Sequence, residues 1–431
     1  MSRGLGDVYK RQDGTATVFS LGAVRPLQIT ELNPHSYSLS ASLTAPAVAT
    51  DQTLTIVGQG FKPSSVARMD GIPLQTLSVS ANGREMTAKI PASMISTPHI
   101  LAVDVFDQTS IPSVSNAEDF TVIESVDVTG PNCTQPAPAG VAFDPQNNLV
   151  VASLSGCNTV AIVNLSTGTG QTVAVGSFPV GVAVMSNVHL AAVANEGSSN
   201  VSIIDELAGA VTQTESTSAG PIGVAVDQNT QEVVVACSQA NTINVFNAIS
   251  PGTAQSYGVD QFPVSAAFDP LDNLIASANA EGNDVSIVDL TNSVTETIGG
   301  MEGPTDIVYD PSEDEFLVSS SLSNQFYAIG AFTQQATPVK VGINPTAIAY
   351  NSLSSTLVTA NTTSGTMTVV DFLDRRIRGV IDLNTYGPKF ISPRASQVLI
   401  PTFSVDTHPL ANLAVVADTN NNRLLIVPLP R

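Results

Sequence analysis

A phrase that recurs every 41 to 42 residues constrains the fold of this chain more than any other feature of its sequence. The phrase is Pro-x-x-(Val or Ile)-Ala-x-Asp, and it is followed by an apolar run, an Asn-containing turn and a second apolar run. Its copies are Pro138–Asp144, Pro179–Met185 (where the acid is lost), Pro221–Asp227, Pro263–Asp269, Pro304–Asp310 and Pro345–Asn351. This period is typical of a β-propeller, whose four-stranded blades bury their faces only by stacking around an axis.

The second half of each unit repeats as well. Its runs are rich in β-branched residues and mostly follow an Asn, such as Asn158, Asn200, Asn241 or Asn283, which tolerates the left-handed conformation of a turn. A seventh unit begins with Pro401 to Asp406 and continues through 413–416 and the turn 418–423. The sequence therefore predicts an all-β chain with a seven-bladed propeller over residues 124–431.

The last unit reaches Arg431 just after its third strand, so its outer strand has to come from elsewhere. Residues Val126–Thr129 precede the first blade and align with Thr172–Val175, the outer strand of that blade. We expect Val126–Thr129 to complete the last blade and to cover an edge that would otherwise promote aggregation. The alternative is that the true last strand lies beyond the C-terminus.

These repeats resemble the YVTN/NHL-type β-propellers of bacterial surface and secreted proteins. The resemblance covers residues 126–431, and Val193–Asn195, Ser277–Asn279 and Thr359–Asn361 are close to the middle phrase of that family. It implies a fold and no particular activity, because such scaffolds carry many unrelated functions.

Residues 29–123 follow a different pattern. Leu54–Phe61 ends in Gly-x-Gly-Phe, Ile90–Ser93 reads Ile-Pro-Ala-Ser, and Phe120–Val122 reads Phe-Thr-Val. These segments resemble an IPT/TIG domain, which implies an immunoglobulin-like sandwich that serves as a spacer or adhesive module outside the cell. Residues 1–12 match neither domain and have the character of translated adapter sequence, so the natural N-terminus is expected to be missing; residues 13–28 are a linker or the tail of a preceding domain.

The charge of the chain excludes several classes of partner. Its net charge is −21, and no Lys or Arg occurs between Ile90 and Val339. Such a surface repels nucleic acids, whose phosphates are bound through cations, and anionic membranes. No apolar run approaches the ~18 residues of a membrane helix, so we expect no transmembrane segment.

Two of the three cysteines are candidates for a disulfide. Cys133 lies in the connection that enters the first blade, and Cys157 lies in a turn of that blade on the same face. A bond between them would fit an oxidising compartment; the alternative is two free thiols. Cys237 ends a buried strand and is expected to be a small core residue.

Catalytic motifs are absent from the sequence, and no catalytic residue, cofactor or metal site is predicted. The four histidines, His35, His99, His189 and His408, are scattered and are expected to be structural or surface groups. The repeated acids Asp144, Asp227, Asp269 and Asp310 could form a ring of carboxylates, but their position beside turns favours capping. Asp418–Asn422 has the alternating oxygen ligands of a calcium loop, yet it lacks the Gly and distal Glu of that motif and is also the turn expected in the seventh blade.

One stretch breaks the period. Pro345 and Pro401 are 56 residues apart, so about 14 residues are inserted near 383–400. The insertion follows Arg375, Arg376 and Arg378 in a chain with few cations, and it is expected to lie on the face of the connections that enter the blades. Its candidate partner-binding residues are Tyr386, Lys389, Phe390 and Arg394. A plain connector is the alternative.

The sequence as a whole predicts a secreted or surface-displayed bacterial protein, expected to be a monomer. Its propeller would bind a protein or glycan of the cell envelope or exterior without catalysis. The alternatives are a propeller lactonase-like hydrolase, which would need acid, base or metal ligands converging in the channel, and a purely structural module of a larger surface protein.

Overall fold

The computed structural model describes residues 8–12, 15–19, 26–107, 112–250, 252, 254–383, 404–408 and 410–430, and for residues 8–19 it describes the backbone alone. Contacts divide the chain into two compact units, one of residues 1–37, 49–96 and 100–121 and one of residues 38–48, 97–99 and 122–431. The predicted partner-binding residues of 384–403 lie outside the described residues. Across the described part of the chain, no helix has the length and apolar character needed to cross a membrane.

The N-terminal unit is built from antiparallel strands. A hairpin of β1 (Val8–Gln12) and β2 (Thr15–Phe19) precedes it in the chain. One sheet has the strand order β3 (Gln28–Asn33), β5 (Gln52–Gln59), β9 (Glu85–Ile90) and β8 (Gln75–Val79). In a second group, β10 (His99–Asp107) pairs with β6 (Ser65–Met69) and β11 (Ser113–Val114), and β6 pairs with β7 (Ile72–Pro73).

Burial in this unit alternates along the strands. Met86, Ala88 and Ile90 of β9 are fully buried, whereas the residues between them are partly exposed, as expected for a sheet with one covered face. The end of β5 needs glycine where it pairs with β3, because a Cβ on Gly58 would lie 2.0 Å from the carbonyl oxygen of Gln28.

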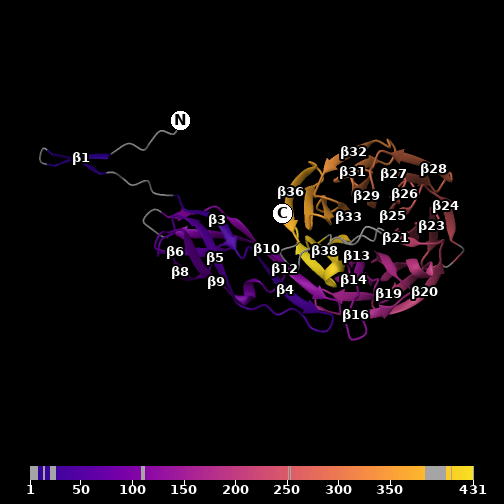
Figure 1. The fold of residues 1–431 in the computed structure, drawn as a ribbon, viewed down its shortest axis with the longest axis horizontal. Coiled ribbons are helices and arrows are strands. Elements are labelled where there is room, and N and C mark those ends of the chain that lie inside the picture. Colours follow the sequence, from indigo (N-terminus) through magenta and orange to yellow (C-terminus); the bar gives the residue numbers. More distant parts are fainter. Residues whose placement is uncertain are drawn as a thin grey trace. The chain divides into compact units, whose positions relative to one another are not determined.

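The second unit repeats a four-stranded antiparallel sheet six times between residues 138 and 382, and Figure 1 shows these sheets set around an axis. The inner strands are β13 (Pro138–Asp144), β17 (Pro179–Met185), β21 (Pro221–Val226), β25 (Pro263–Asp269), β29 (Pro304–Asp310) and β33 (Pro345–Asn351). The second strands are β14 (Leu149–Leu154), β18 (Leu190–Asn195), β22 (Glu232–Cys237), β26 (Leu274–Asn279), β30 (Glu315–Ser320) and β34 (Thr356–Asn361). This arrangement is that of a β-propeller.

The third strands follow by tight turns. They are β15 (Thr159–Asn164), β19 (Asn200–Asp205), β23 (Thr242–Asn247), β27 (Asp284–Asp289), β31 (Gln325–Gly330) and β35 (Thr366–Asp371). The outer strands are β16 (Thr169–Ala174), β20 (Ala210–Ser216), β24 (Gln255–Gly258), β28 (Val294–Gly299), β32 (Ala336–Lys340) and β36 (Arg376–Asp382). The middle strands are covered on both faces and read as continuous apolar runs, whereas the outer strands are largely exposed and polar.

The predicted closing strand is present, but it pairs through residues 124–127 and so lies two residues earlier than the predicted Val126–Thr129. After β36 come β37 (Val405–His408), β38 (Leu413–Asp418) and β39 (Arg423–Pro428), and β39 pairs antiparallel with residues 124–127 of β12 (Glu118–Asp127). Val126 lies opposite Leu424 in this pairing. An early segment of the chain therefore supplies the outer strand of the last sheet.

Apolar clusters lie between all successive sheets and also across this closure. Val126 and Leu424 share one cluster with Val141 and Val150 of the first sheet. The segment 38–48, which includes most of β4 (Ser36–Ser42), packs on the same cluster through Leu43, whose carbonyl oxygen accepts a 2.7 Å hydrogen bond from the Gly170 N–H. Cys237 is a free, fully buried thiol in the core, as predicted.

An asparagine side chain ties successive sheets together. Asn158, in the turn between β14 and β15, has φ 56° and accepts a 2.9 Å hydrogen bond from the Phe178 N–H at the start of the next sheet. The bond recurs at Asn241 with Phe262, at Asn283 with Gly303, at Asn324 with Asn344 and, across the closure, at Asn422 with Ala137. The predicted left-handed turn residue Asn200 is an exception, because Ser199 takes that conformation instead.

The repeated aspartates cap turns and do not form a ring of carboxylates. Asp144, Asp227, Asp269 and Asp310 each accept a hydrogen bond of 2.8 to 3.0 Å through Oδ1 from the N–H two residues later. In the last sheet His408 occupies this position, and its Nδ1 accepts the N–H groups of Leu410 and Ala411. Burial lowers the pKa of His408, which keeps the imidazole neutral and able to accept.

Glu206 is a buried acid at a position that is apolar in other sheets. It follows the turn aspartate Asp205, where Leu165, Ala248 and Leu290 stand in neighbouring units, and only 1% of its surface is exposed. Burial, together with the adjacent Asp144, raises the pKa of Glu206 to about 9. Hydrogen bonds from neighbouring groups, such as the side chain of Asn147, hold the pKa of Asp144 below its usual value, against the effect of burial. At neutral pH Glu206 therefore keeps its proton, whereas Asp144 is ionised.

The structure joins Cys133 and Cys157 in a disulfide with a Cα separation of 5.7 Å, which lies within the usual range. Cys133 precedes β13 and Cys157 lies in the turn between β14 and β15. The bond therefore fixes the entry to the first sheet against the turn of its second and third strands.

Replacing Val126 with Asp should lower the free energy of unfolding by about 3 kcal/mol or more, because it places an unpaired charge in the closing cluster. Urea unfolding measures the loss. Val211 lies on the outer strand β20 and is 37% exposed, so Val211→Asp is the matched control and should cost far less. Equal losses in the two variants would show that ring closure does not depend on β12.

In protein from an oxidising compartment, Cys133 and Cys157 should be joined by a disulfide and should therefore not react with an alkylating reagent. Alkylation without reductant followed by intact-mass measurement should then show one modified cysteine, whereas three would rule out the bond. Cys133→Ser with Cys157→Ser should lower stability by about 3 kcal/mol, because the bond closes a loop of sequence separation 24. Cys237→Ser alone should leave the alkylation result for the pair unchanged.

Glu206→Gln should flatten the pH dependence of stability. The folded chain keeps a proton that an ordinary glutamate releases near pH 4.5, so stability falls as the pH rises above 4.5 and levels off above about 9. Glutamine can still donate to Asp144 and has no proton to lose. Chemical unfolding at about pH 5, 7 and 9 tests this window. Glu281 is exposed, so Glu281→Gln is the control. If the free energy of unfolding of Glu206→Gln depended on pH as steeply as that of the wild type, the proton retained by Glu206 would be refuted.

Candidate functional site

The inner strands enclose a cavity of about 850 Å³ on the propeller axis. It opens among polar residues of the turns that follow these strands, including Gln146, Asn187, Gln228 and Asn229. A second cavity of about 100 Å³ continues between the same strands, and Ser265, Asp306 and Ser404 line both. The axis therefore holds a wide mouth that narrows where these three residues, together with Val182 and Val224, line both cavities.

The narrow end is lined mainly by small residues for a steric reason. A Cβ on Gly140 would lie 2.3 Å from the carbonyl oxygen of Val180, and one on Gly181 would lie 2.2 Å from that of Ile222. Gly223 approaches Val264 in the same way, at 2.6 Å. No real Cβ tolerates such distances, so the close approach of neighbouring inner strands requires glycine at this position in these three strands.

Asp306 occupies the equivalent position in β29 and fills the axis with a carboxylate. Its Oδ1 accepts a 2.7 Å hydrogen bond from the Ser265 hydroxyl, and its Oδ2 accepts a 3.0 Å bond from the Ile348 N–H of the next sheet. Burial raises the pKa of Asp306 to about 6, although these bonds oppose the shift. The acid is thus held rigidly and loses its proton just below neutral pH.

Asp406 is the second carboxylate of the cavity. It stands in β37 where the other inner strands place Ala or Val, and its Oδ2 accepts a 2.7 Å hydrogen bond from the Phe143 N–H of the first sheet. Burial raises its pKa to about 6, and the charge of Asp306 adds to this shift. Both acids therefore use main-chain N–H groups of a neighbouring sheet as partners.

The cavity carries negative charge and no described counter-charge. No Lys, Arg or His is among its described lining residues. Carboxylates, amides and hydroxyls, with Tyr309 and Tyr350 at the wider part, can bind hydroxyl, ammonium or guanidinium groups. Since this lining includes no Cys, its nucleophiles are limited to hydroxyls and to the carboxylates of Asp227, Asp306 and Asp406.

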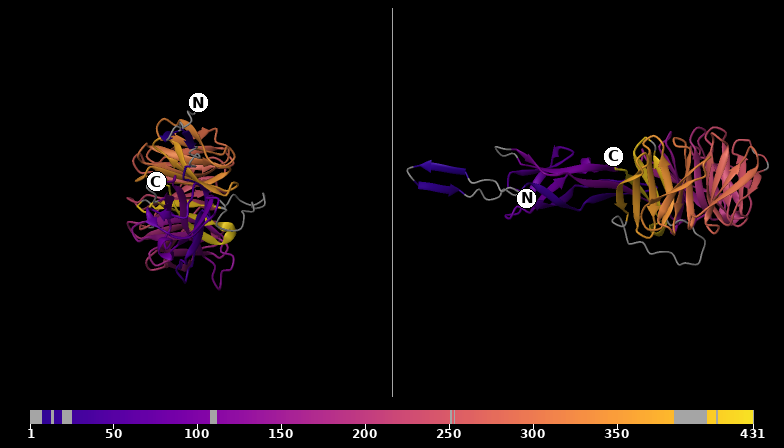
Figure 2. Two further views of the ribbon diagram at one scale, coloured as in Figure 1. Left: turned by 90° about the vertical axis from the view of Figure 1, so that its left-hand side faces the viewer. Right: turned by 90° about the horizontal axis from the view of Figure 1, so that it is seen from above.

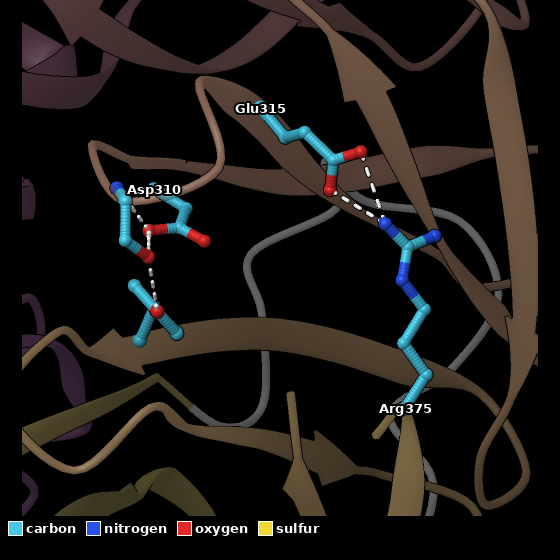
Figure 3. A network of polar contacts seen from close by, with 5 residues as sticks. Asp310, Glu315 and Arg375 are labelled. Atoms are coloured by element: carbon cyan, nitrogen blue, oxygen red, sulfur yellow. Dashed lines mark hydrogen bonds and ion pairs between the residues drawn. The ribbon is translucent and has the colours of Figure 1, made fainter. Parts of the chain in front are cut away.

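Two of the three arginines that precede the insertion, Arg375 and Arg378, are engaged in ion pairs. Figure 3 shows the Arg375 guanidinium against Glu315, at 2.8 Å from Oε2, and Arg378 bonds to Asp371 at 2.6 Å. Asp310 in the same view accepts from Ser312, whose hydroxyl lies 3.1 Å from that of Tyr350. The predicted residues Tyr386, Lys389, Phe390 and Arg394 lie outside the described residues, so the structure places none of them at a site.

Asp306 and Asp406 were not predicted as site residues, although the repeated phrase contains a signal for Asp306. The third residue of the repeated phrase is Gly140, Gly181, Gly223 and Ser265 in the first copies, and then Asp306. A single charged residue at a repeat position that otherwise holds small residues indicates that this side chain has a role that the other copies lack. Asp406 was harder to find, because the opening of the last unit does not keep the phrase.

Comparisons with known proteins support the fold. No protein-family model matches the chain, and no curated protein matches it. Among solved structures, hydrazine synthase of Kuenenia stuttgartiensis has 15% identity and a TM-score of 0.58, over 70% of this chain and 97% of that one. Virginiamycin B lyase of Staphylococcus aureus has 12% identity and a TM-score of 0.57, over 72% and 99%. A streptogramin B lyase has 13% identity and a TM-score of 0.57, over 70% and 96%. At these identities the likeness shows a β-propeller fold alone.

Proposed function

We propose that this chain is a secreted or cell-surface binding protein, with a seven-bladed propeller of the YVTN/NHL type preceded by an immunoglobulin-like IPT/TIG domain. Its propeller recognises a polar group of a protein or glycan at the mouth of the axial cavity. The observation that carries this proposal is the cavity of about 850 Å³ with amide, hydroxyl and carboxylate groups around its opening. Such a lining suits hydroxyl-rich or amine-bearing groups, which need several fixed acceptors.

The location outside the cell rests on two features. The chain carries a net charge of −21 with few cations, and the structure holds a disulfide, a bond that persists in oxidising compartments. The N-terminal unit, with its alternating strands, suits a spacer. The protein is expected to act as a monomer.

A hydrolase or lyase is the second candidate, and the pair of axial carboxyls favours it. Two acids with a pKa of about 6 in one cavity could divide the roles of general acid and base near neutral pH. Propeller enzymes also occur among the structural neighbours, such as virginiamycin B lyase. Against this candidate, main-chain N–H groups already hold both carboxylates.

Filling the mouth should separate these functions from a purely structural role. Ala183→Trp with Ala225→Trp places two large side chains into the cavity, and binding to arrays of envelope glycans and peptides should weaken by about 1.4 kcal/mol, or tenfold, or more. Val211→Trp, on an exposed outer strand, is the control. Binding that survives in a normally folded filled variant would refute the axial site. Loss on replacing Tyr386, Phe390 and Arg394 with Ala would instead assign recognition to the insertion.

The axial acids allow a test of binding against catalysis. Asp306→Asn and Asp406→Asn should weaken the binding of amine-bearing ligands and remove its decline as the pH falls through about 6. A panel of lactones and cyclic esters, with product detection, tests turnover. Turnover by the wild type that both variants abolish would favour the enzyme; absence of turnover together with pH-dependent binding would favour the binding protein.

A further inference from the structure

The capping aspartates differ in how their second oxygen is satisfied. In the first sheet, Asp144 Oδ2 accepts a 2.6 Å hydrogen bond from the side chain of Asn147, three residues later. In the third sheet, Asp227 Oδ2 accepts a 2.6 Å bond from Thr230, again three residues later. A donor at this position therefore completes the cap, while Oδ1 binds the main chain of the turn.

The fourth sheet has an acid where that donor belongs. Asp269 Oδ1 caps its turn at 2.8 Å from the Leu271 N–H, but the residue three positions later is Asp272, which has no proton to donate as a carboxylate. Asp269 is fully buried, and its Oδ2 has no hydrogen-bond partner. A buried carboxylate oxygen without a donor is costly, so this atom points to a ligand.

A third acid reaches the same place from the next sheet. Carboxylate oxygens of Asp269, Asp272 and Asp314 lie within 4.8 Å of one another. The Tyr309 hydroxyl lies beside them, and its single proton goes to Asp314 Oδ1 at 2.9 Å. None of the ion pairs between described residues involves these three acids.

We propose that Asp269, Asp272 and Asp314 bind a calcium ion between the fourth and fifth four-stranded sheets of the propeller. Calcium prefers carboxylate oxygens at 2.3–2.6 Å, so two ligands of one ion are at most about 5 Å apart, and the oxygens of the three acids lie within 4.8 Å of one another. The buried Asp269 Oδ2 provides the inner ligand. Asp272 and Asp314 are partly exposed, which leaves room for water molecules to complete the shell. The ion would supply the positive charge that this part of the chain lacks.

The next pair of sheets offers an internal comparison. Asp310 caps its turn in the same way, its Oδ2 is also without a partner, and Glu313 stands three residues later. The following sheet, however, places Ser355 where Asp314 stands in the proposed site. Within the described part of the chain, only the Asp269, Asp272 and Asp314 group brings three acids together. The two turns thus differ in the feature that a metal site requires.

The turn at Asp418 is not a second candidate calcium site. Its Oδ2 accepts bonds of 2.8 Å from both Asn421 and Arg423, and its Oδ1 accepts from Asn421 at 3.0 Å. Hydrogen-bond donors, one of them a cation, therefore occupy both oxygens. The calcium-like spacing noticed in the sequence at this turn belongs to an ordinary cap.

The test is calorimetric titration of the full chain, stripped with EDTA, with CaCl2, together with thermal unfolding in EDTA and in CaCl2. Wild-type protein should bind one calcium ion and melt at a higher temperature with calcium. Asp272→Asn should lose both effects and should fold without the ion, because asparagine at this position donates to the cap as Asn147 does in the first sheet. Glu313→Gln, the matched change at the Asp310 turn, should keep both effects.

Asp314→Asn provides a second variant that leaves the turn of Asp269 unchanged, and it should also lose the calcium response. The proposal is overturned if wild-type protein shows no calcium binding. It is also overturned if both Asp272→Asn and Asp314→Asn keep the full response. An equal response to MgCl2 would contradict the assignment to calcium.

Discussion

The close approach of neighbouring inner strands at the axis is the constraint on which the rest of the propeller depends. Gly140, Gly181 and Gly223 lie so near the next strand that a Cβ would collide with a carbonyl oxygen. This spacing determines which residues can line the axis and how narrow it becomes. It also brings main-chain N–H groups of one sheet within reach of the side chains of its neighbour, and Asp306 and Asp406 are held in this way.

A shortage of cations shapes the polar interior. With no Lys or Arg between residues 90 and 339, the acids of this region cannot be neutralised by ion pairs inside it. The chain uses three other means. Main-chain groups together with Asn147 or Thr230 satisfy the capping Asp144 and Asp227, Glu206 retains its proton beside Asp144, and a bound cation is proposed where Asp272 replaces a donor. Each means removes negative charge or disperses it without a basic side chain.

The periodic part of the structure could be predicted from the sequence, because stacking imposes the same residue types on every unit. The turn caps at Asp144 and Asp269 follow from this rule, and so does the closing strand at Val126, whose existence was required by the missing fourth strand. The candidate sites could not be predicted in the same way. Glu206 and Asp306 matter because they depart from the repeat, and their consequences depend on neighbours in another sheet that the sequence does not identify.

The pairing of β12 with β39 has a consequence for synthesis of the protein. Residues 124–127 leave the ribosome about 300 residues before their partners, residues 423–426. At about 5–20 residues per second, the intervening chain takes roughly 15 to 60 s to synthesise. During this time the edge of β12 that will pair with β39 has no native partner, and the first sheet has an uncovered apolar face. The first sheet and β12 therefore cannot complete their native packing until β39 has been synthesised.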